Sequence, residues 1–158
     1  MVRAFVEDDW PAVAAIIDEV LRAGETYPIP VLDDAGARAY WFGLDHVIVA
    51  ERDGVVVGTA NMGPNRQAQG SHIGTASFLV AGDARGTGVG GELVDGVIAW
   101  HREQGFRGIQ FNAVVETNPA AVRLYTGRGF TTIGTVPGAF RLPDGRYTGL
   151  HVMFLPLT

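Results

Sequence analysis

A glycine-rich stretch in the middle of the chain constrains the fold most. Residues 85–91 read Arg-Gly-Thr-Gly-Val-Gly-Gly. The segment before them, Ala76–Val80, has the composition of a strand, and apolar residues recur every three to four positions after them, to about Gly105, as on one helix face. A strand, a glycine turn and a helix leave bare backbone N–H groups at the helix N-terminus, where an anion binds favourably. We therefore predict a pyrophosphate cradle here, with Arg85 as an added cation.

Two other interpretations of this stretch remain open from its residues. The pattern Gly86-x-Gly88-x-x-Gly91 matches the dinucleotide fingerprint, but that fingerprint expects the first strand of a βαβ unit and an acid about 20 residues further on. Here the stretch follows several predicted strands, and the nearest acid at a strand end, Glu116, comes late. A glycine turn without a ligand is the second interpretation. A Walker loop is excluded because no Gly-Lys-Ser or Gly-Lys-Thr follows.

A second motif gives the stretch its context. Asn-Pro-Ala-Ala at residues 118–121 opens a predicted helix that carries Leu124-Tyr125 and leads to Gly129-Phe130. Together with Arg85-x-x-Gly88-x-Gly90, this motif resembles the GNAT superfamily of N-acetyltransferases, whose acetyl-CoA loop has the form Gln/Arg-x-x-Gly-x-Gly/Ala. The resemblance covers most of the chain from Val47 to Leu155 and implies an enzyme, an acetyl-CoA-dependent N-acetyltransferase.

Composition sets wider limits. A length of 158 residues, with 47% apolar and 18% charged residues, predicts one domain over residues 1–158. The net charge of −5 argues against nucleic acid or an anionic membrane as the main partner. The absence of cysteine excludes disulfides, thiolate metal sites and a cysteine nucleophile, and we predict no metal. No signal sequence and no apolar run long enough to cross a membrane is found, so we expect a cytoplasmic protein.

Strands and helices are both expected along the chain. We expect strands at residues 2–6, 47–50, 55–61, 72–80, 109–115, 130–136 and 148–155, and helices that begin at Asp8 or Asp9, Asp33-Asp34, residue 89 and Asn118. Antiparallel strands come first and a β-helix-β-helix-β half follows. This order predicts an α+β (mixed α/β) domain with one central mixed sheet and helices on both faces. The GNAT resemblance adds a pair of parallel strands that splay apart around the cradle helix.

The resemblance also implies where acetyl-CoA binds. Its pantetheine arm would lie in the V-shaped slot between the splayed strands and bond to the backbone of the strand that ends at Phe78, Leu79 and Val80. The pyrophosphate would lie on Arg85, Gly86, Thr87, Gly88, Val89 and Gly90. A backbone N–H near Leu79 or Val80 would stabilise the oxyanion. Asn118 is implied as a contact of the cofactor or the substrate.

The resemblance assigns an acid but no certain base. Tyr125 matches the family's general-acid tyrosine, and the alternative is a tyrosine that only packs under Phe130. An aliphatic ammonium has a pKa of about 10, so the acceptor must lose a proton before it attacks. Glu116, His72 and Glu25 are candidate bases, each with a structural alternative, and a relay of water molecules is a further option.

Candidate acceptor residues come from two segments. By the resemblance, residues 25–42 form a wall of the acceptor pocket, which makes Tyr27 and Tyr40 candidates, with simple packing as the alternative. Asn112 interrupts an apolar run, and a buried amide without partners would cost roughly 1–3 kcal/mol. Either backbone at a bulge or a substrate should satisfy it. The segment around Asn112 and Asn118 resembles acetyltransferases of proline analogues, which use asparagines to orient a small amino acid, although residues 71–75 lack an asparagine of that subgroup.

The predicted reaction is transfer of an acetyl group from acetyl-CoA to the amine of a small, amino-acid-like acceptor, by direct attack in a ternary complex. A non-catalytic acyl-CoA sensor, a dinucleotide-binding oxidoreductase and an acetyltransferase of peptide or protein amines are the alternatives. The expected partner is a small-molecule amine. Dimers are frequent in the family, so the resemblance also makes a homodimer an option.

Overall fold

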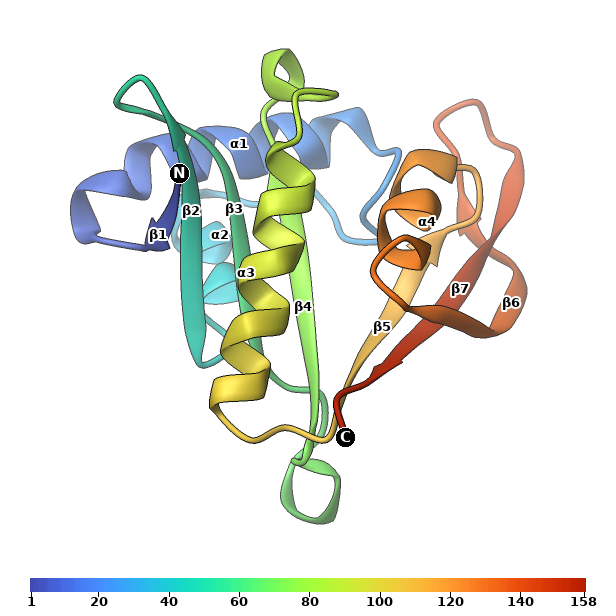
Figure 1. The fold of residues 1–158 in the computed structure, drawn as a ribbon. Helices are drawn as coiled ribbons and strands as arrows, with labels where there is room; N and C mark the ends of the chain where they lie inside the picture. Colours follow the sequence, from blue (N-terminus) through green and yellow to red (C-terminus); the bar gives the residue numbers. More distant parts are fainter.

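A seven-stranded mixed sheet forms the centre of the computed structural model, which describes residues 1–158 (Figure 1). The strand order is β1-β2-β3-β4-β5-β7-β6. The strands are β1 Val2–Ala4, β2 His46–Arg52, β3 Val55–Pro64, β4 Ile73–Val80, β5 Gly108–Val115, β6 Thr131–Arg141 and β7 Tyr147–Pro156. All neighbouring pairs are antiparallel except β4 and β5. The predicted mixed α/β architecture is confirmed.

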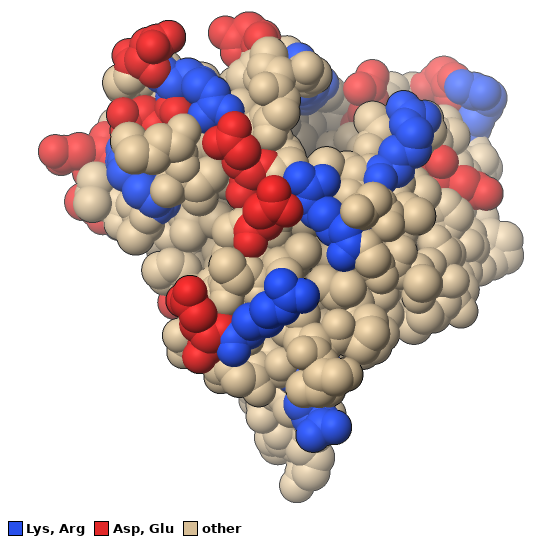
Figure 2. All heavy atoms as spheres, in the orientation of Figure 1, with Lys and Arg blue, Asp and Glu red and all other residues tan.

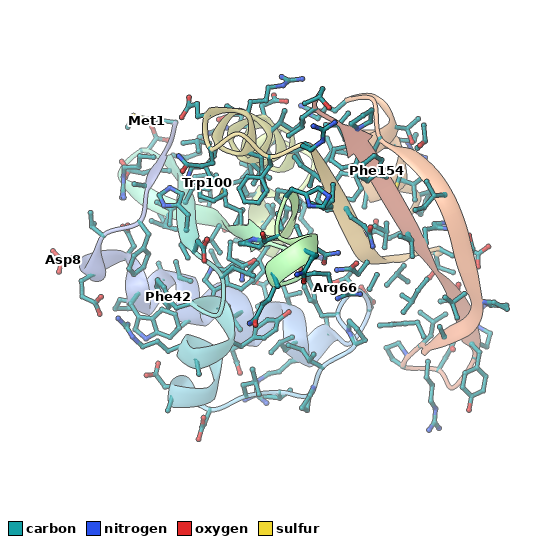
Figure 3. The ribbon with its side chains drawn as sticks, turned by 90° about the horizontal axis from the view of Figure 1, so that it is seen from below. Met1, Asp8, Phe42, Arg66, Trp100 and Phe154 are labelled. Atoms are coloured by element: carbon teal, nitrogen blue, oxygen red, sulfur yellow. The ribbon has the colours of Figure 1, made fainter.

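Four α-helices cover the two faces of this sheet. They are α1 Trp10–Ala23, α2 Asp34–Trp41, α3 Val89–Glu103 and α4 Pro119–Thr126. In Figure 1, α3 lies in front of the sheet, whereas α1 and α2 lie behind it. Figure 3 shows the same layers from below, with Trp100 of α3 and Phe42 at the end of α2 on opposite sides. No helix of the chain has the length and apolar character needed to cross a bilayer.

The core consists of two clusters, one on each face. The cluster under α3 includes Ile48, Met62, Leu93, Ile109 and Phe111, all buried. The cluster under α1 and α2 takes the alternate strand residues Val47, Val49 and Leu79, together with Trp41 and other helix residues. Because successive strand side chains point to opposite faces, a strand buried on both faces reads as a continuous apolar run, which is the pattern at residues 47–50.

The helix ends follow the local signals in the sequence. Gly24 ends α1 with a φ of 64°, in the left-handed region that glycine adopts readily. The Asp33 side chain accepts the Gly36 N–H at the start of α2, and Asn118 accepts the Ala121 N–H at the start of α4. Asp9 precedes α1, but its carboxylate accepts from Arg3 and from the Val6 N–H instead of capping the helix.

Several strand boundaries differ from the sequence prediction by two residues or more, and among them β2 extends to Arg52 and β3 to Pro64, beyond the expected residues 50 and 61. The first strand ends at Ala4 instead of residue 6, and β6 continues through Pro137 to Arg141. Proline is tolerated there because β6 is an edge strand and its register with β7 shifts between Val136 and Phe140.

Strands β4 and β5 separate almost as soon as they meet. They pair in parallel only at Ile73 with Gly108 and at Gly74 with Ile109. Beyond these residues they diverge into a V, which Figure 1 shows open at the top. Each strand is otherwise held from its outer side, β4 by β3 and β5 by β7. The splayed parallel pair that the family resemblance implied is therefore present.

Candidate active site

A cleft of about 860 Å³ opens between β4 and β5. Its walls come from the loop after α1, from β4 and β5, from the start of α4 and from the turn between β6 and β7. A recess is visible at the upper edge of the molecule in Figure 2, whose face carries acidic and basic side chains intermixed. Ten of the predicted site residues line this cleft: Glu25, Tyr27, Tyr40, Phe78, Leu79, Val80, Arg85, Asn112, Asn118 and Tyr125.

The glycine cradle adjoins the cleft at Arg85. Gly86 and Gly88 have φ values of 76° and 91°, so glycine is required for this backbone path. A Cβ at either residue would meet nothing within 4 Å, which shows that the surface above them is open. The N–H groups of residues 86–91 donate to no backbone carbonyl, and the first bond of the helix is from Glu92 N–H to Gly88 C=O. Such a set of free donors at a helix N-terminus fits a phosphate group.

The other predicted residues lie outside the cleft proper. Gly86, Thr87, Gly88, Val89 and Gly90 form the cradle beyond Arg85. His72 is exposed and lies just before Ile73, at the narrow end of the V.

Glu116 follows β5 and uses its carboxylate to accept the Gly149 N–H of β7 at 2.9 Å, which ties it to the sheet. Of the three candidate bases, only Glu25 lines the cleft, and it forms no ion pair.

Tyr125 belongs to an aromatic group that bridges the two arms of the V. Its ring centroid lies 5.9 Å from that of Phe78 in β4 and 4.7 Å from that of Phe111 in β5. It also lies 6.0 Å from Phe130, so Tyr125 both lines the cleft and packs on Phe130. Burial raises the pKa of the Tyr125 phenol. The phenol therefore stays protonated at neutral pH and is available as a hydrogen-bond donor.

Tyr27 bonds to the inner edge of β4. Its hydroxyl accepts the Phe78 N–H at 3.0 Å and donates to the Phe78 C=O at 2.8 Å. Both groups of Phe78 therefore point away from β3 and into the splay. Alternation turns the N–H of Leu79 toward β3, whereas the N–H groups of Phe78 and Val80 face the splay as possible backbone donors. Burial, and then the nearby phenols of Tyr125 and Tyr40, raise the pKa of Tyr27.

One part of the cleft lining is polar and partly charged. Tyr40 of α2 lines it, and burial raises the pKa of this phenol, opposed by the nearby Ser77 side chain. Asp144 and Arg146, in the turn between β6 and β7, lie at the cleft and form an ion pair with each other at 2.7 Å. Sequence analysis did not name Asp144 and Arg146 as site residues, because no local pattern places the turn between β6 and β7 at the cleft.

Asn112 differs from the expected buried amide, because its side chain is exposed at the cleft. It lies at the irregularity between Phe111 and Val114, where β5 shifts register against β7. Its Nδ2 donates to Asn65 at 2.6 Å, and its Oδ1 accepts from Gln110 at 3.0 Å. The amide is thus satisfied by other side chains, an arrangement that neither sequence alternative described.

The chain resembles proteins of one family over most of its length. Residues 10–130 match the Acetyltransferase (GNAT) family. A GCN5-related N-acetyltransferase from Kribbella flavida has 48% sequence identity and a TM-score of 0.95, with 99% of this chain and 97% of that chain covered. The L-methionine sulfoximine/L-methionine sulfone acetyltransferase of Pseudomonas aeruginosa is 30% identical over 161 residues, which cover 94% of this chain and 90% of the relative.

Another relative is named for a different acceptor. The ribosomal-protein-alanine N-acetyltransferase of Brucella melitensis has 30% identity and a TM-score of 0.85, with 99% of each chain covered. Two yeast relatives match only in part, since the aligned regions span 13% of Protein SPT10 from Saccharomyces cerevisiae and 42% of N-acetyltransferase aca1 from Schizosaccharomyces pombe. The family match and the three relatives aligned over nearly their whole length lead to one conclusion: the chain belongs to the GNAT family of acetyltransferases, which use acetyl-CoA.

Proposed function

We propose that this enzyme transfers the acetyl group of acetyl-CoA to the amine of a small, amino-acid-like acceptor. The observation that carries the proposal is one cleft that joins three features. The β4–β5 splay offers strand backbone that is not paired with another strand, the cradle at its mouth offers free N–H groups, and Tyr125 lies between the two arms. Each of these three features would bind a different part of the elongated acetyl-CoA molecule.

The residues present fit the donor. The N–H groups of residues 86–91 and the guanidinium of Arg85 provide positive charge for the pyrophosphate. The inner edge of β4 provides N–H and C=O groups, by alternation at Ala76 and Val80, for the amides of the pantetheine arm. When bound, acetyl-CoA supplies an acetyl group activated as a thioester.

Two cleft residues then take the roles of general acid and general base in the transfer. The acceptor nitrogen forms a bond to the carbonyl carbon and the bond from that carbon to sulfur breaks. Tyr125 donates its proton to the leaving sulfur, because burial keeps the phenol protonated. Glu25, directly or through water, accepts the proton that the amine must lose, since it is the candidate base that lines the cleft. Solvent restores both groups.

The acceptor would bind at the polar part of the cleft lining. Tyr27, Tyr40 and Asn112 belong to this lining, and the Asp144–Arg146 pair adds both charges to it. An amino-acid-like molecule carries both charges as well, so its ammonium and its carboxylate each find an opposite charge nearby. The methionine sulfoximine acetyltransferase among the relatives supports an acceptor of this class.

An N-terminal peptide amine is a second candidate. The relative named for ribosomal-protein alanine is as similar in sequence as the one named for methionine sulfoximine. A peptide would enter the cleft by its N-terminus, and its next residues would pass the exposed turn at Asp144 and Arg146.

Thiol release from acetyl-CoA, followed with a chromogenic disulfide, tests the proposal. The chain has no cysteine, so the protein adds no background signal. The acceptor panel contains methionine sulfoximine, methionine sulfone, proline analogues, polyamines and peptides that begin with alanine. Release with the amino-acid analogues alone supports the proposal, and release with peptides alone supports the second candidate. Binding of acetyl-CoA without release for any acceptor contradicts both and favours a sensor.

A further inference from the structure

The Tyr27 hydroxyl is hydrogen-bonded to the backbone N–H and C=O of Phe78, which face the slot where the acyl donor is proposed to bind. Its oxygen accepts the Phe78 N–H at 3.0 Å and its proton is donated to the Phe78 C=O at 2.8 Å. The two residues are 51 positions apart, so this contact is a feature of the fold and not of local sequence. It supplies to β4 the two hydrogen bonds that β5 no longer makes after the strands diverge.

The Phe78 N–H lies at the place where the chemistry is expected. The Phe78 ring contacts the ring of Tyr125, the proposed acid, at 5.9 Å between centroids. Tyr125 must reach the sulfur, so the adjacent thioester carbonyl lies near the same residue of β4. An oxygen placed there would compete with the phenol of Tyr27 for the Phe78 N–H.

The phenol of Tyr27 is suited to donate a hydrogen bond while it keeps its proton. Its burial raises the pKa, so the hydroxyl keeps its proton. The residue lies between Gly24, which ends α1, and the prolines at positions 28 and 30, which restrict the backbone of the loop. A rotation about the C–O bond redirects its proton without a change in the loop.

We propose that Tyr27 is a second oxyanion donor. In the bound state the thioester oxygen takes the Phe78 N–H from the phenol, and the Tyr27 O–H turns from the Phe78 C=O to the same oxygen. No covalent bond to Tyr27 forms or breaks, and its proton stays on the phenol throughout. This inference rests on the proposed acetyl transfer.

The number of hydrogen bonds before and after donor binding predicts which kinetic constant depends on Tyr27. The Tyr27 hydroxyl and the Phe78 N–H each donate one hydrogen bond before and after the exchange, so Tyr27 adds little to the affinity for acetyl-CoA. Negative charge develops on the carbonyl oxygen only during attack, and the two donors are then worth more. Tyr27 should therefore raise kcat with little effect on donor binding.

The variant Tyr27→Phe tests whether the hydroxyl affects kcat without affecting the affinity for acetyl-CoA. We expect kcat to fall by roughly 10²-fold, the size of effect seen when one oxyanion donor is removed. We expect the calorimetric Kd for acetyl-CoA to stay within about threefold, because the bound and free states lose similar interactions. Tyr147→Phe is the matched control, because Tyr147 is 69% exposed and does not line the cleft. A folded Tyr27→Phe variant with normal kcat would overturn the inference, whether its binding of acetyl-CoA is unchanged or weakened.

A second measurement needs no variant and no turnover. The backbone amide signal of Phe78 is followed by NMR in the wild-type protein with saturating acetyl-CoA or with S-ethyl-CoA, a thioether that lacks the carbonyl oxygen. We expect acetyl-CoA to shift this signal more than S-ethyl-CoA does. Equal shifts would mean that the carbonyl never meets the Phe78 N–H. A wild-type protein that does not bind acetyl-CoA would instead refute the proposed function itself.

Discussion

The side chains of Asn112 and Asn65 hydrogen-bond at 2.6 Å and so connect the strands on either side of β4. Asn65 directly follows β3, and Asn112 lies in β5. Gln110 donates to the other polar atom of Asn112, so the amide is oriented from both ends. Each end keeps one unused bonding position, an N–H on Nδ2 and a lone pair on Oδ1, that an acceptor could take.

Asn65→Ala should therefore weaken acceptor binding from a distance. We expect the acceptor KM to rise by about tenfold, the equivalent of one lost hydrogen bond of about 1.4 kcal/mol, as it should for Asn112→Ala, while the KM for acetyl-CoA is unchanged. Steady-state kinetics with each substrate varied in turn measures both constants. Gln67→Ala, at an exposed position in the same loop, is the control. An effect on stability alone would show that these amides only secure the irregular part of β5.

Gly88→Glu should abolish donor binding. The substitution places a carboxylate among the free N–H groups of the cradle and forces a side chain onto a φ of 91°. We expect a Kd for acetyl-CoA at least about 10²-fold weaker by calorimetry, since like charges are brought together. Gly54→Glu controls for backbone strain, because Gly54 has a φ of 77° in the exposed β2–β3 turn with equally open space. Unchanged affinity in folded Gly88→Glu would remove the phosphate site from the cradle.

Tyr125→Phe should lower kcat by about 10²-fold, the contribution of a positioned acid. The ring contacts with Phe78 and Phe111 remain, so the fold should be preserved. Burial raises the pKa of this phenol, so wild-type activity should show no alkaline loss caused by Tyr125 at the pH values where the acceptor amine titrates. Rates of the two proteins are compared from neutral to alkaline pH. Identical profiles with identical rates would exclude Tyr125 as the acid.

Asp9→Asn should destabilise the fold in a pH-dependent way. Asp9 is buried and accepts two hydrogen bonds from Arg3, at 2.7 and 2.8 Å, which hold its pKa below the usual range. A depressed carboxyl pKa adds stability above the unfolded value of about 3.9, and this stability is lost as the pH falls through the folded value.

Urea unfolding of wild type and Asp9→Asn measures this effect. At pH 7 we expect a difference of about 2 kcal/mol, typical of hydrogen bonds to a charged group. The difference should shrink as the pH falls below about 4. A difference that is constant with pH would mean that the substitution disturbs packing and that the charge of Asp9 adds nothing.

The parts of the site that depend on local sequence could be predicted. The free N–H groups follow from a strand, glycines and a helix in succession, and Gly88 indeed has a positive φ. Asn118 caps α4, as the Asn-Pro pair indicates, and this places Tyr125 on the helix that lines the cleft. Each of these features is set within a few residues, so pattern and backbone preference determine it.

The contacts between distant residues could not be predicted. Tyr27 and Phe78, or Asn65 and Asn112, meet across 51 and 47 positions, and no pattern in one segment reports a partner in another. The same limit affects the candidate bases. Glu116 directly follows β5, yet its carboxylate accepts a hydrogen bond from the Gly149 N–H of the neighbouring strand β7. Only the register of β5 with β7 determines that choice.

The short pairing of β4 with β5 also means that the sheet is mechanically incomplete. Two register pairs join a four-stranded half to a three-stranded half, so a donor lying along β4 would serve as the missing strand between them. Because the donor binds only the folded protein, its binding adds to the free energy of unfolding: acetyl-CoA at 100 times its Kd stabilises the protein by about 2.7 kcal/mol. The melting temperature of this protein should therefore report how much of it is loaded, and an inert variant that still holds the donor should melt like the active enzyme.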